Sequence, residues 1–213
     1  LHASTSHTKA ISVAKKKGLI ILVNNPNGRS APFQPEHTSE LRQEVANGKN
    51  YTNKELGFTG SVADYFRSQS LGKLDIEFDV VGPYMLAHKR WYYGTNQGYS
   101  HDTKPGEMIA EAVLAADADV NYADYDWDGD GEVDQVFVLY AGLGEHDGGS
   151  ATTIWPHESK LSASDYKKAI NLDGVKIDTY ACSSELQRGS TICGIGTICH
   201  EFSHCLGFPD TYD

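Results

Sequence analysis

The chain has 213 residues, of which 39% are hydrophobic and 22% charged, and its formal net charge at pH 7 is −11. A chain of this length and composition is expected to bury a sizeable core and to form one globular domain. Its acidic surface argues against nucleic acid as a partner, and no stretch approaches the roughly 18 uninterrupted apolar residues that indicate a membrane span.

Residues 1–17 mix Ser, Thr, His and Lys without strong periodicity, so this stretch is expected to be an unstructured N-terminal tail. The run Lys15-Lys16-Lys17 is alternatively a processing site. Because the chain begins at Leu1 without a signal peptide, we expect a processed or engineered fragment that has lost any export signal. Residues 18–213 are expected to form the domain itself.

Hydrophobic patterning then predicts strands and helices in alternation. The expected strands span residues 18–23, 74–80, 135–141 and 175–180, and the expected helices span 40–46, 61–70, 105–119 and 194–206. Ser61 is a favourable N-cap, and Pro105 is favourable in a first helical turn. The order suits an α/β (α+β) fold in which a twisted mixed sheet is backed by helices.

The last predicted helix carries His200 and His204 at positions i and i+4, on one face. Two imidazoles so placed can hold one Zn²⁺. Glu201 lies about a quarter-turn round the helix, close enough to act as general base on a water activated by the metal. The pattern HExxH alone arises by chance in roughly two of a hundred shuffled chains, so the residues that follow it matter.

After the histidines, Gly207 can adopt the left-handed conformation that ends a helix, and Pro209 stiffens the returning chain. Asp210 is therefore expected to come back as a third zinc ligand, with water in the fourth position. Requiring Gly and Asp as well lowers the chance frequency to the order of one in ten thousand. The sequence thus favours a catalytic zinc site.

A second predicted metal site is the segment from residue 126 to residue 134. Its carboxylates occupy positions 1, 3, 5 and 9 of a calcium loop, and Glu132 at position 7 offers its backbone carbonyl. The predicted Ca²⁺ residues are Asp126, Asp128, Asp130, Glu132 and Asp134. Phe137 replaces the glutamate at position 12, so a further ligand is expected from Asp124 or Asp119. The alternative is a solvated acidic turn.

The four cysteines are Cys182, Cys193, Cys199 and Cys205. Cys199 and Cys205 are too far apart along their helix to bridge each other. In an exported protein, a bridge between Cys182 and Cys193 is the favoured pairing, and buried free thiols are the alternative.

The run from Ile198 to Asp213 resembles the immune inhibitor A family of secreted bacterial metallopeptidases, which carry a comparable HExxHxxGxPD-x-YD sequence. The acidic loop, the segment 154–157 and the segment 180–185 are similar to that family too, so the resemblance covers roughly residues 60–213. It implies a metzincin-like catalytic fold, zinc-dependent endopeptidase activity, bound calcium and export from a bacterium. It also implies that His200, His204 and Asp210 bind zinc and that Glu201 is the general base.

The chain departs from the broader metzincin pattern in two ways. Asp210 stands where many metzincins have His, and no methionine follows the motif, since Met85 and Met108 lie far upstream. Residues 18–213 are therefore expected to be the upper part of a catalytic domain. The lower C-terminal lobe is expected to come from a missing C-terminal portion of the same protein.

The expected function is hydrolysis of peptide bonds in protein or peptide substrates. Two alternatives remain open. One is a non-catalytic calcium- and zinc-binding module derived from a protease, against which the intact Glu201 argues. The other is a zinc hydrolase that acts on sugars or small amides. His146 and His157 are expected to be surface or structural histidines.

Overall fold

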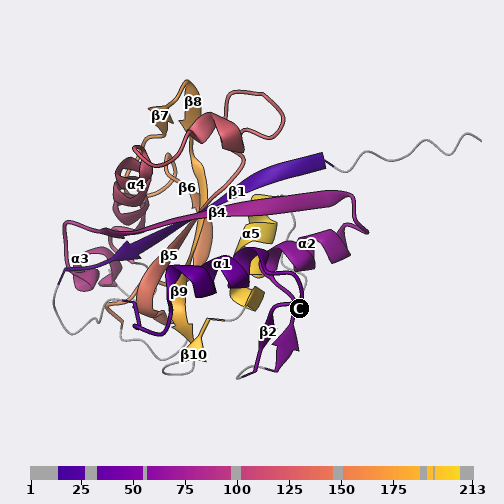
Figure 1. Cartoon of the computed structure of the whole chain (residues 1–213). Helices are drawn as coiled ribbons and strands as arrows, with labels where there is room; N and C mark the ends of the chain where they lie inside the picture. The colour runs from indigo at the N-terminus through magenta and orange to yellow at the C-terminus, as the bar shows by residue number, and fades with distance from the viewer. Residues whose placement is uncertain are drawn as a thin grey trace, which may run out of the picture.

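The computed structural model describes residues 14–26, 33–54, 57–96, 102–145, 151–187, 191–193 and 195–206. A mixed sheet lies between two layers of helices (Figure 1). The strand order is β10-β9-β5-β1-β4, and β6 also pairs with β9. The strands from β9 to β4 run parallel, whereas β10 and β6 run antiparallel to β9. The predicted α/β class with a twisted mixed sheet is confirmed.

The strands of this sheet are β1 (Ala14–Asn24), β4 (Leu74–Met85), β5 (Val136–Leu143), β6 (His157–Lys160), β9 (Thr179–Gln187) and β10 (Thr191–Ile192). Two small antiparallel pairs are β2 (Thr52–Asn53) with β3 (Phe58–Thr59), and β7 (Ile170–Leu172) with β8 (Val175–Ile177). The helices are α1 (Ser39–Asn47), α2 (Val62–Gln69), α3 (Arg90–Gly94), α4 (Pro105–Ala116) and α5 (Ile195–Cys205), with a 3-10 turn, η1, at Tyr122–Tyr125.

The central strand β1 shows why the sheet is covered on both sides. Its residues 19–23 are apolar and all buried, as expected for a parallel strand between two helical layers. Leu19 and Ile21 pack in the core that contains α4. Ile20 and Leu22 point to the opposite face and pack in the core formed with α1, α2 and α5. The sheet therefore separates two hydrophobic cores, and α5 belongs to the second.

Local signals in the sequence set several helix ends. Ser61 caps α2 through a capping box: its hydroxyl accepts from the Asp64 N–H at 3.2 Å, and the Asp64 carboxylate accepts from the Ser61 N–H at 3.4 Å. Helix α4 begins at Pro105 as predicted, although it ends at Ala116 instead of residue 119.

Further predicted boundaries are wrong, and two of them change the reading of the fold. Residues 14–17 belong to β1 and pair with β4 from Leu74 to Glu77, so the expected tail does not extend to residue 17; residues 1–13 lie outside the described residues. The expected single strand 175–180 is two strands, since β8 ends at Ile177 and β9 runs from Thr179 to Gln187. Buried Ser183, Ser184 and Glu185 continue β9 beyond its apolar part, which is why hydrophobic patterning missed them.

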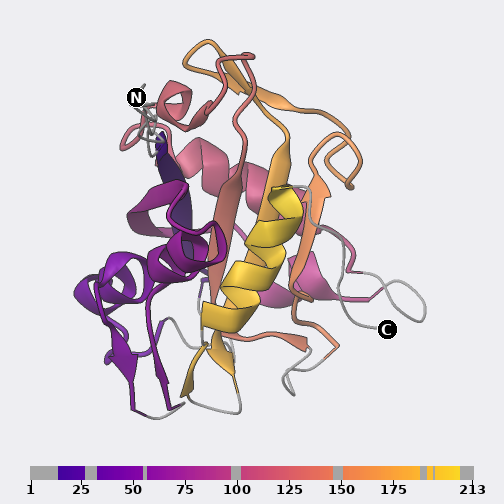
Figure 2. The same cartoon turned by 90° about the vertical axis from the view of Figure 1, so that its right-hand side faces the viewer.

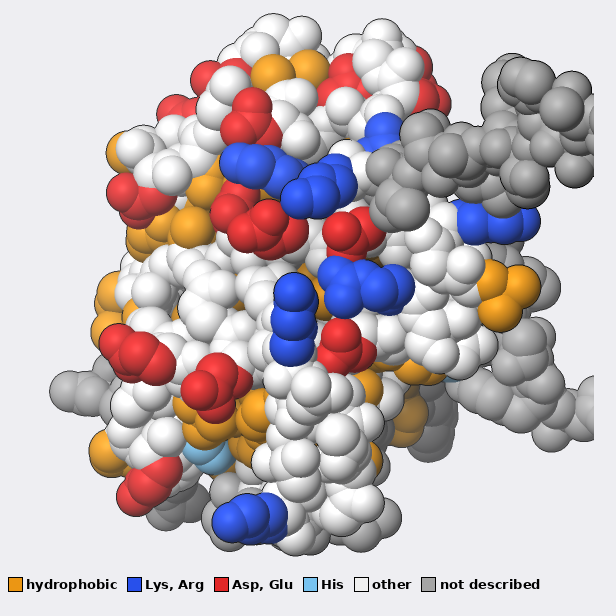
Figure 3. All heavy atoms as spheres, turned by 45° about the vertical axis from the view of Figure 1, so that its right-hand side comes forward, with side chains coloured by type: hydrophobic (Ala, Val, Ile, Leu, Met, Phe, Trp, Pro, Cys, Tyr) orange, Lys and Arg blue, Asp and Glu red, His pale blue; other side chains and the backbone are white. Residues whose placement is uncertain are grey.

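Acidic and basic side chains are interspersed on the face shown in Figure 3. Arg67 of α2, for example, donates to the Asp75 carboxylate of β4 at 3.1 Å. None of the helices within the described ranges is both long and apolar enough to cross a membrane.

Candidate metal centre

Helix α5 lies across one face of the sheet, alongside β9 and next to β6 (Figure 2). Its inner face consists of Ile198, Cys199 and Phe202, which are buried in the second core. The side chains of His200 and His204 lie on a different face and are only partly buried. The amphipathic pattern of the helix therefore places the two histidines away from its core-facing side.

The two imidazoles converge. The Nε2 atoms of His200 and His204 are 3.1 Å apart, and the ring planes are nearly perpendicular with centroids 4.6 Å apart. Two Zn–N bonds of about 2.0–2.1 Å at a tetrahedral angle require nitrogen atoms about 3.3 Å apart. The observed separation is close to this value, so the histidine pair fits one zinc ion.

Glu201 completes this cluster. It is buried, with 8% of its surface exposed, and one of its carboxylate oxygens lies within 4.8 Å of ligand nitrogens of both histidines. The structure thus brings together three of the four residues expected at the zinc site. Asp210, the expected third ligand, lies outside the described residues, so its role stays a prediction.

An aromatic cluster fixes the position of α5. Phe202 is fully buried, and its ring centroid lies 4.9 Å from that of Phe66 in α2 and 5.4 Å from that of Phe78 in β4. The indole of Trp127 lies 6.2 Å away from the same ring. Because Phe202 directly follows Glu201 in the helix, this packing also sets where the glutamate lies.

Trp127 is part of the acidic loop expected to bind calcium. Carboxylate oxygens of Asp126, Asp128 and Asp130 all lie within 4.8 Å of one another. Gly129 and Gly131 have φ values of 77° and 87°, which glycine adopts without strain. The loop therefore gathers three of the five predicted calcium residues.

The carboxylates of the other two predicted calcium residues make further contacts. The Glu132 carboxylate accepts from the Lys176 ammonium at 2.8 Å, which leaves only its backbone carbonyl for a cation, as expected. Asp134 accepts from the backbone N–H of Trp127. Burial raises the pKa of Asp134, and the charges of Asp128, Asp126 and Asp130 raise it further, whereas the Trp127 N–H lowers it.

The suggested extra calcium ligands are engaged in other contacts. Asp124 lies 3.3 Å from the Lys17 ammonium, and Asp119 accepts from the Tyr84 hydroxyl. Neither belongs to the group of converging carboxylates found within the described part of the chain. The structure therefore gives no support to either as the further ligand.

The favoured disulfide is also wrong, because all four cysteines are free thiols. Cys182 faces the core next to α4 and lies 3.4 Å from the His157 ring, whereas the next residue, Ser183, contacts the Cys193 sulfur at 3.9 Å. Consecutive strand residues point to opposite faces, so Cys182 and Cys193 lie on opposite sides of the sheet. Burial raises the pKa of Cys182, Cys199 and Cys205, so these thiols stay protonated at neutral pH.

Strand β6 was not anticipated from the sequence. His157 lies 2.7 Å from the Trp155 carbonyl and 3.0 Å from the Tyr180 hydroxyl, in agreement with the structural role expected for it. His146 lies outside the described residues. The next residue of β6, Glu158, pairs with Ala181 of β9. All four residues of this strand are polar, so hydrophobic patterning gives no signal for it.

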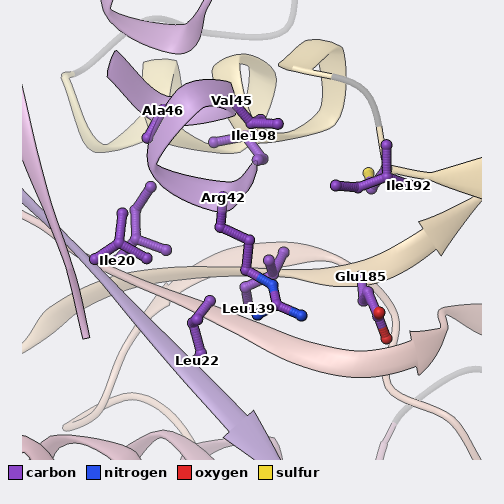
Figure 4. A pocket seen from close by; sticks show the side chains of 11 residues that line it. Ile20, Leu22, Arg42, Val45, Ala46, Leu139, Glu185, Ile192 and Ile198 are labelled. Atoms are coloured by element: carbon purple, nitrogen blue, oxygen red, sulfur yellow. The ribbon is translucent and has the colours of Figure 1, made fainter. Parts of the chain in front are cut away.

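Sequence reasoning also missed a polar cluster behind α5. Glu185 is 1% exposed and accepts from the Gln34 N–H at 2.6 Å and from the Gly142 N–H at 2.9 Å; its other contact is His37 Nδ1 at 2.7 Å. Together with Arg42 it borders a mostly apolar pocket between α1, the sheet and α5 (Figure 4). These contacts fix the segment before α1 against the sheet.

Comparison with known proteins agrees with this architecture. The catalytic-domain model of the immune inhibitor A peptidase family, M6, matches residues 22–213. The pre-pro-metalloprotease PrtV of Vibrio cholerae serotype O1 is 28% identical over 208 residues, which cover 84% of this chain and 22% of the relative. Immune inhibitor A of Bacillus thuringiensis subsp. alesti is 26% identical over 175 residues, which cover 70% of this chain and 25% of the relative. The chain spans about a quarter of the length of these relatives, and it belongs to the immune inhibitor A (M6) peptidase family.

Proposed function

We propose that this domain is a zinc-dependent endopeptidase. The observation that carries the proposal is the convergence of His200 and His204, 3.1 Å apart at Nε2, next to the buried carboxylate of Glu201. Two imidazoles alone can serve metal binding, whereas a glutamate directly after the first histidine of an HExxH helix is placed to act as a general base. Membership of a peptidase family supports the same reaction.

In this proposal His200, His204 and Asp210 hold the zinc ion. When bound, zinc lowers the pKa of water and polarises the carbonyl that is attacked. Glu201 accepts the proton of the attacking water and returns a proton to the leaving amine. The fully buried Phe202 anchors the turn of α5 that carries Glu201, so both transfers can use the same position of the helix.

Strand β6 is the proposed binding edge for an extended substrate. It pairs with β9 on one side, runs antiparallel to it, and contacts α5. An extended peptide can add to such an edge through main-chain hydrogen bonds, which bind a backbone of any sequence. This position brings a substrate alongside α5, the helix that carries His200 and His204.

We also propose that Asp126, Asp128, Asp130, Asp134 and the Glu132 carbonyl bind a structural Ca²⁺. The mutual repulsion of the gathered carboxylates and the raised pKa of Asp134, which is caused mainly by burial, support a hard cation in this loop. Export from a bacterial cell, and completion of the cleft by a C-terminal portion of the same protein, remain parts of the proposal.

The decisive experiment compares the full-length protein with its Glu201→Gln variant. Casein degradation should stop on chelation and return with zinc in the wild type, and it should be abolished in the variant. Zinc content, measured by mass spectrometry, should be equal in both. A variant that retains activity excludes Glu201 as the base. If the folded wild type binds zinc but cleaves no protein, the non-catalytic metal-binding module is the better description.

A further inference from the structure

Glu158 places a partly buried carboxylate on the edge strand beside the metal helix. It pairs with Ala181 of β9, and directly opposed residues of an antiparallel ladder have their side chains on the same face. Ala181 packs in the core that contains Ile198 and Phe202 of α5. The Glu158 side chain therefore extends from the sheet face that α5 covers.

The same edge strand lies next to the helix that carries the proposed general base. Strand β6 contacts α5, and Glu201 is one of the buried residues of α5. Glu158 therefore extends on the side of the sheet where the Glu201 helix packs.

Several other acidic side chains in the described part of the chain are paired with cations. Glu132 lies 2.8 Å from the Lys176 ammonium, and Glu107 lies 3.0 Å from that of Lys104. Among the residues that the structure describes, Glu158 has no comparable ion pair or hydrogen bond through its carboxylate. A partly buried carboxylate without a counter-charge attracts a cation more strongly than one in bulk water, because the local dielectric constant is lower.

We propose that Glu158 makes the peptidase selective for substrates with a Lys or Arg side chain at the position facing it. This inference rests on the proposed peptidase function and adds the substrate class. In a peptide strand added to β6, every second side chain lies on the α5 face, with Cβ atoms about 5 Å from their cross-strand neighbours. A basic side chain there reaches the Glu158 carboxylate without any change in the main chain.

The test uses sets of three peptides that are identical except at one position, where they carry Lys, neutral norleucine or Glu. One such set is made for each position flanking the cleaved bond. At one position the wild type should show kcat/KM about tenfold higher for Lys than for norleucine, a preference that weakens at high salt. Glu158→Gln should lower the ratio to about one, and Glu158→Lys should favour Glu. Glu77→Gln is the matched control, because Glu77 is an exposed carboxylate on β4, at the opposite edge of the sheet.

A second measurement separates selectivity from catalysis. Peptide affinities measured in the zinc-loaded Glu201→Gln protein, with and without Glu158→Gln, report the preference when no bond is cleaved. The proposal is overturned if the Lys preference survives Glu158→Gln, if this change lowers kcat equally for all peptides, or if Lys and norleucine peptides bind equally well. Loss of cleavage together with a retained Lys preference in binding would instead refute the peptidase function and leave the basic-peptide site standing.

Discussion

The contact between Trp127 and Phe202 leads to a specific prediction, because it joins the acidic loop, residues 126–134, to α5. The Trp127 indole N–H donates to the Lys17 carbonyl at 2.7 Å, and the ring packs on Phe202. Replacing Trp127 with Ala removes both interactions, whereas replacing it with Phe keeps an aromatic ring and removes only the hydrogen bond.

The expected losses follow from these contacts. A hydrogen bond contributes about 1 kcal/mol, an aromatic pair about 0.5–1.5 kcal/mol, and the burial of part of the indole about 1 kcal/mol. Trp127→Ala should therefore lower the free energy of unfolding by about 2–4 kcal/mol, and Trp127→Phe by about 1 kcal/mol. Urea unfolding followed by circular dichroism, with metals chelated, measures both values.

A double-mutant cycle isolates the ring contact. Trp127→Ala combined with Phe202→Leu should show a coupling energy of about 0.5–1.5 kcal/mol. Trp155→Ala is the control partner, because its side chain is exposed and should add to Phe202→Leu without coupling. If the first pair is additive within about 0.3 kcal/mol, the packing argument for the position of α5 does not hold.

Three other perturbations test the remaining interactions. Ser61→Ala should lower the free energy of unfolding by about 1 kcal/mol in a urea titration, since the capping box of α2 is lost, and Ser61→Asp should restore most of it. Lys176→Met should change the same quantity by less than about 1 kcal/mol, and by nothing measurable in about 1 M salt, because the pair with Glu132 is substantially exposed. Asp134→Asn should change the melting temperature in opposite directions with and without calcium. The folded-state pKa of Asp134 is raised, so without calcium the stability that this residue contributes is present below its unfolded pKa of about 3.8. That contribution is lost as pH rises through the folded pKa. Without calcium the variant should therefore melt at or above the wild-type temperature at neutral pH, and with calcium below it; a variant that melts alike under both conditions relative to wild type would count against a cation in the loop.

The parts of the fold that the sequence predicted depend on local interactions. Ser61 and Pro105 mark helix starts because capping and a fixed φ act within one turn. The pairing of His200 with His204 was predictable for the same reason, since i and i+4 converge in any α-helix. The position of Glu201, the proposed general base, follows from the same motif.

The parts that were missed depend on contacts between distant segments. Glu185 is a buried carboxylate in a strand, stabilised by N–H groups from residues 34 and 142. Because these donors are distant in the sequence, local patterning cannot predict them. The incorrect pairing of Cys182 with Cys193 has the same origin. Their opposite orientation follows from the alternation of β9, which becomes visible only when the strand is known to continue through Ser183.

The aromatic cluster explains how α5 is held in the position that the proposed metal site needs. Phe202 has neighbours from α2, β4 and the acidic loop, so movement of α5 in any of these directions compresses one contact and opens another. A gap of about 0.5–1 Å already forfeits a quarter to a half of the dispersion energy of the contacts that it separates. Since Phe202 follows Glu201 and lies two residues from each histidine, the same packing restrains all three side chains, and a shift of Trp127 in the acidic loop acts directly on that packing.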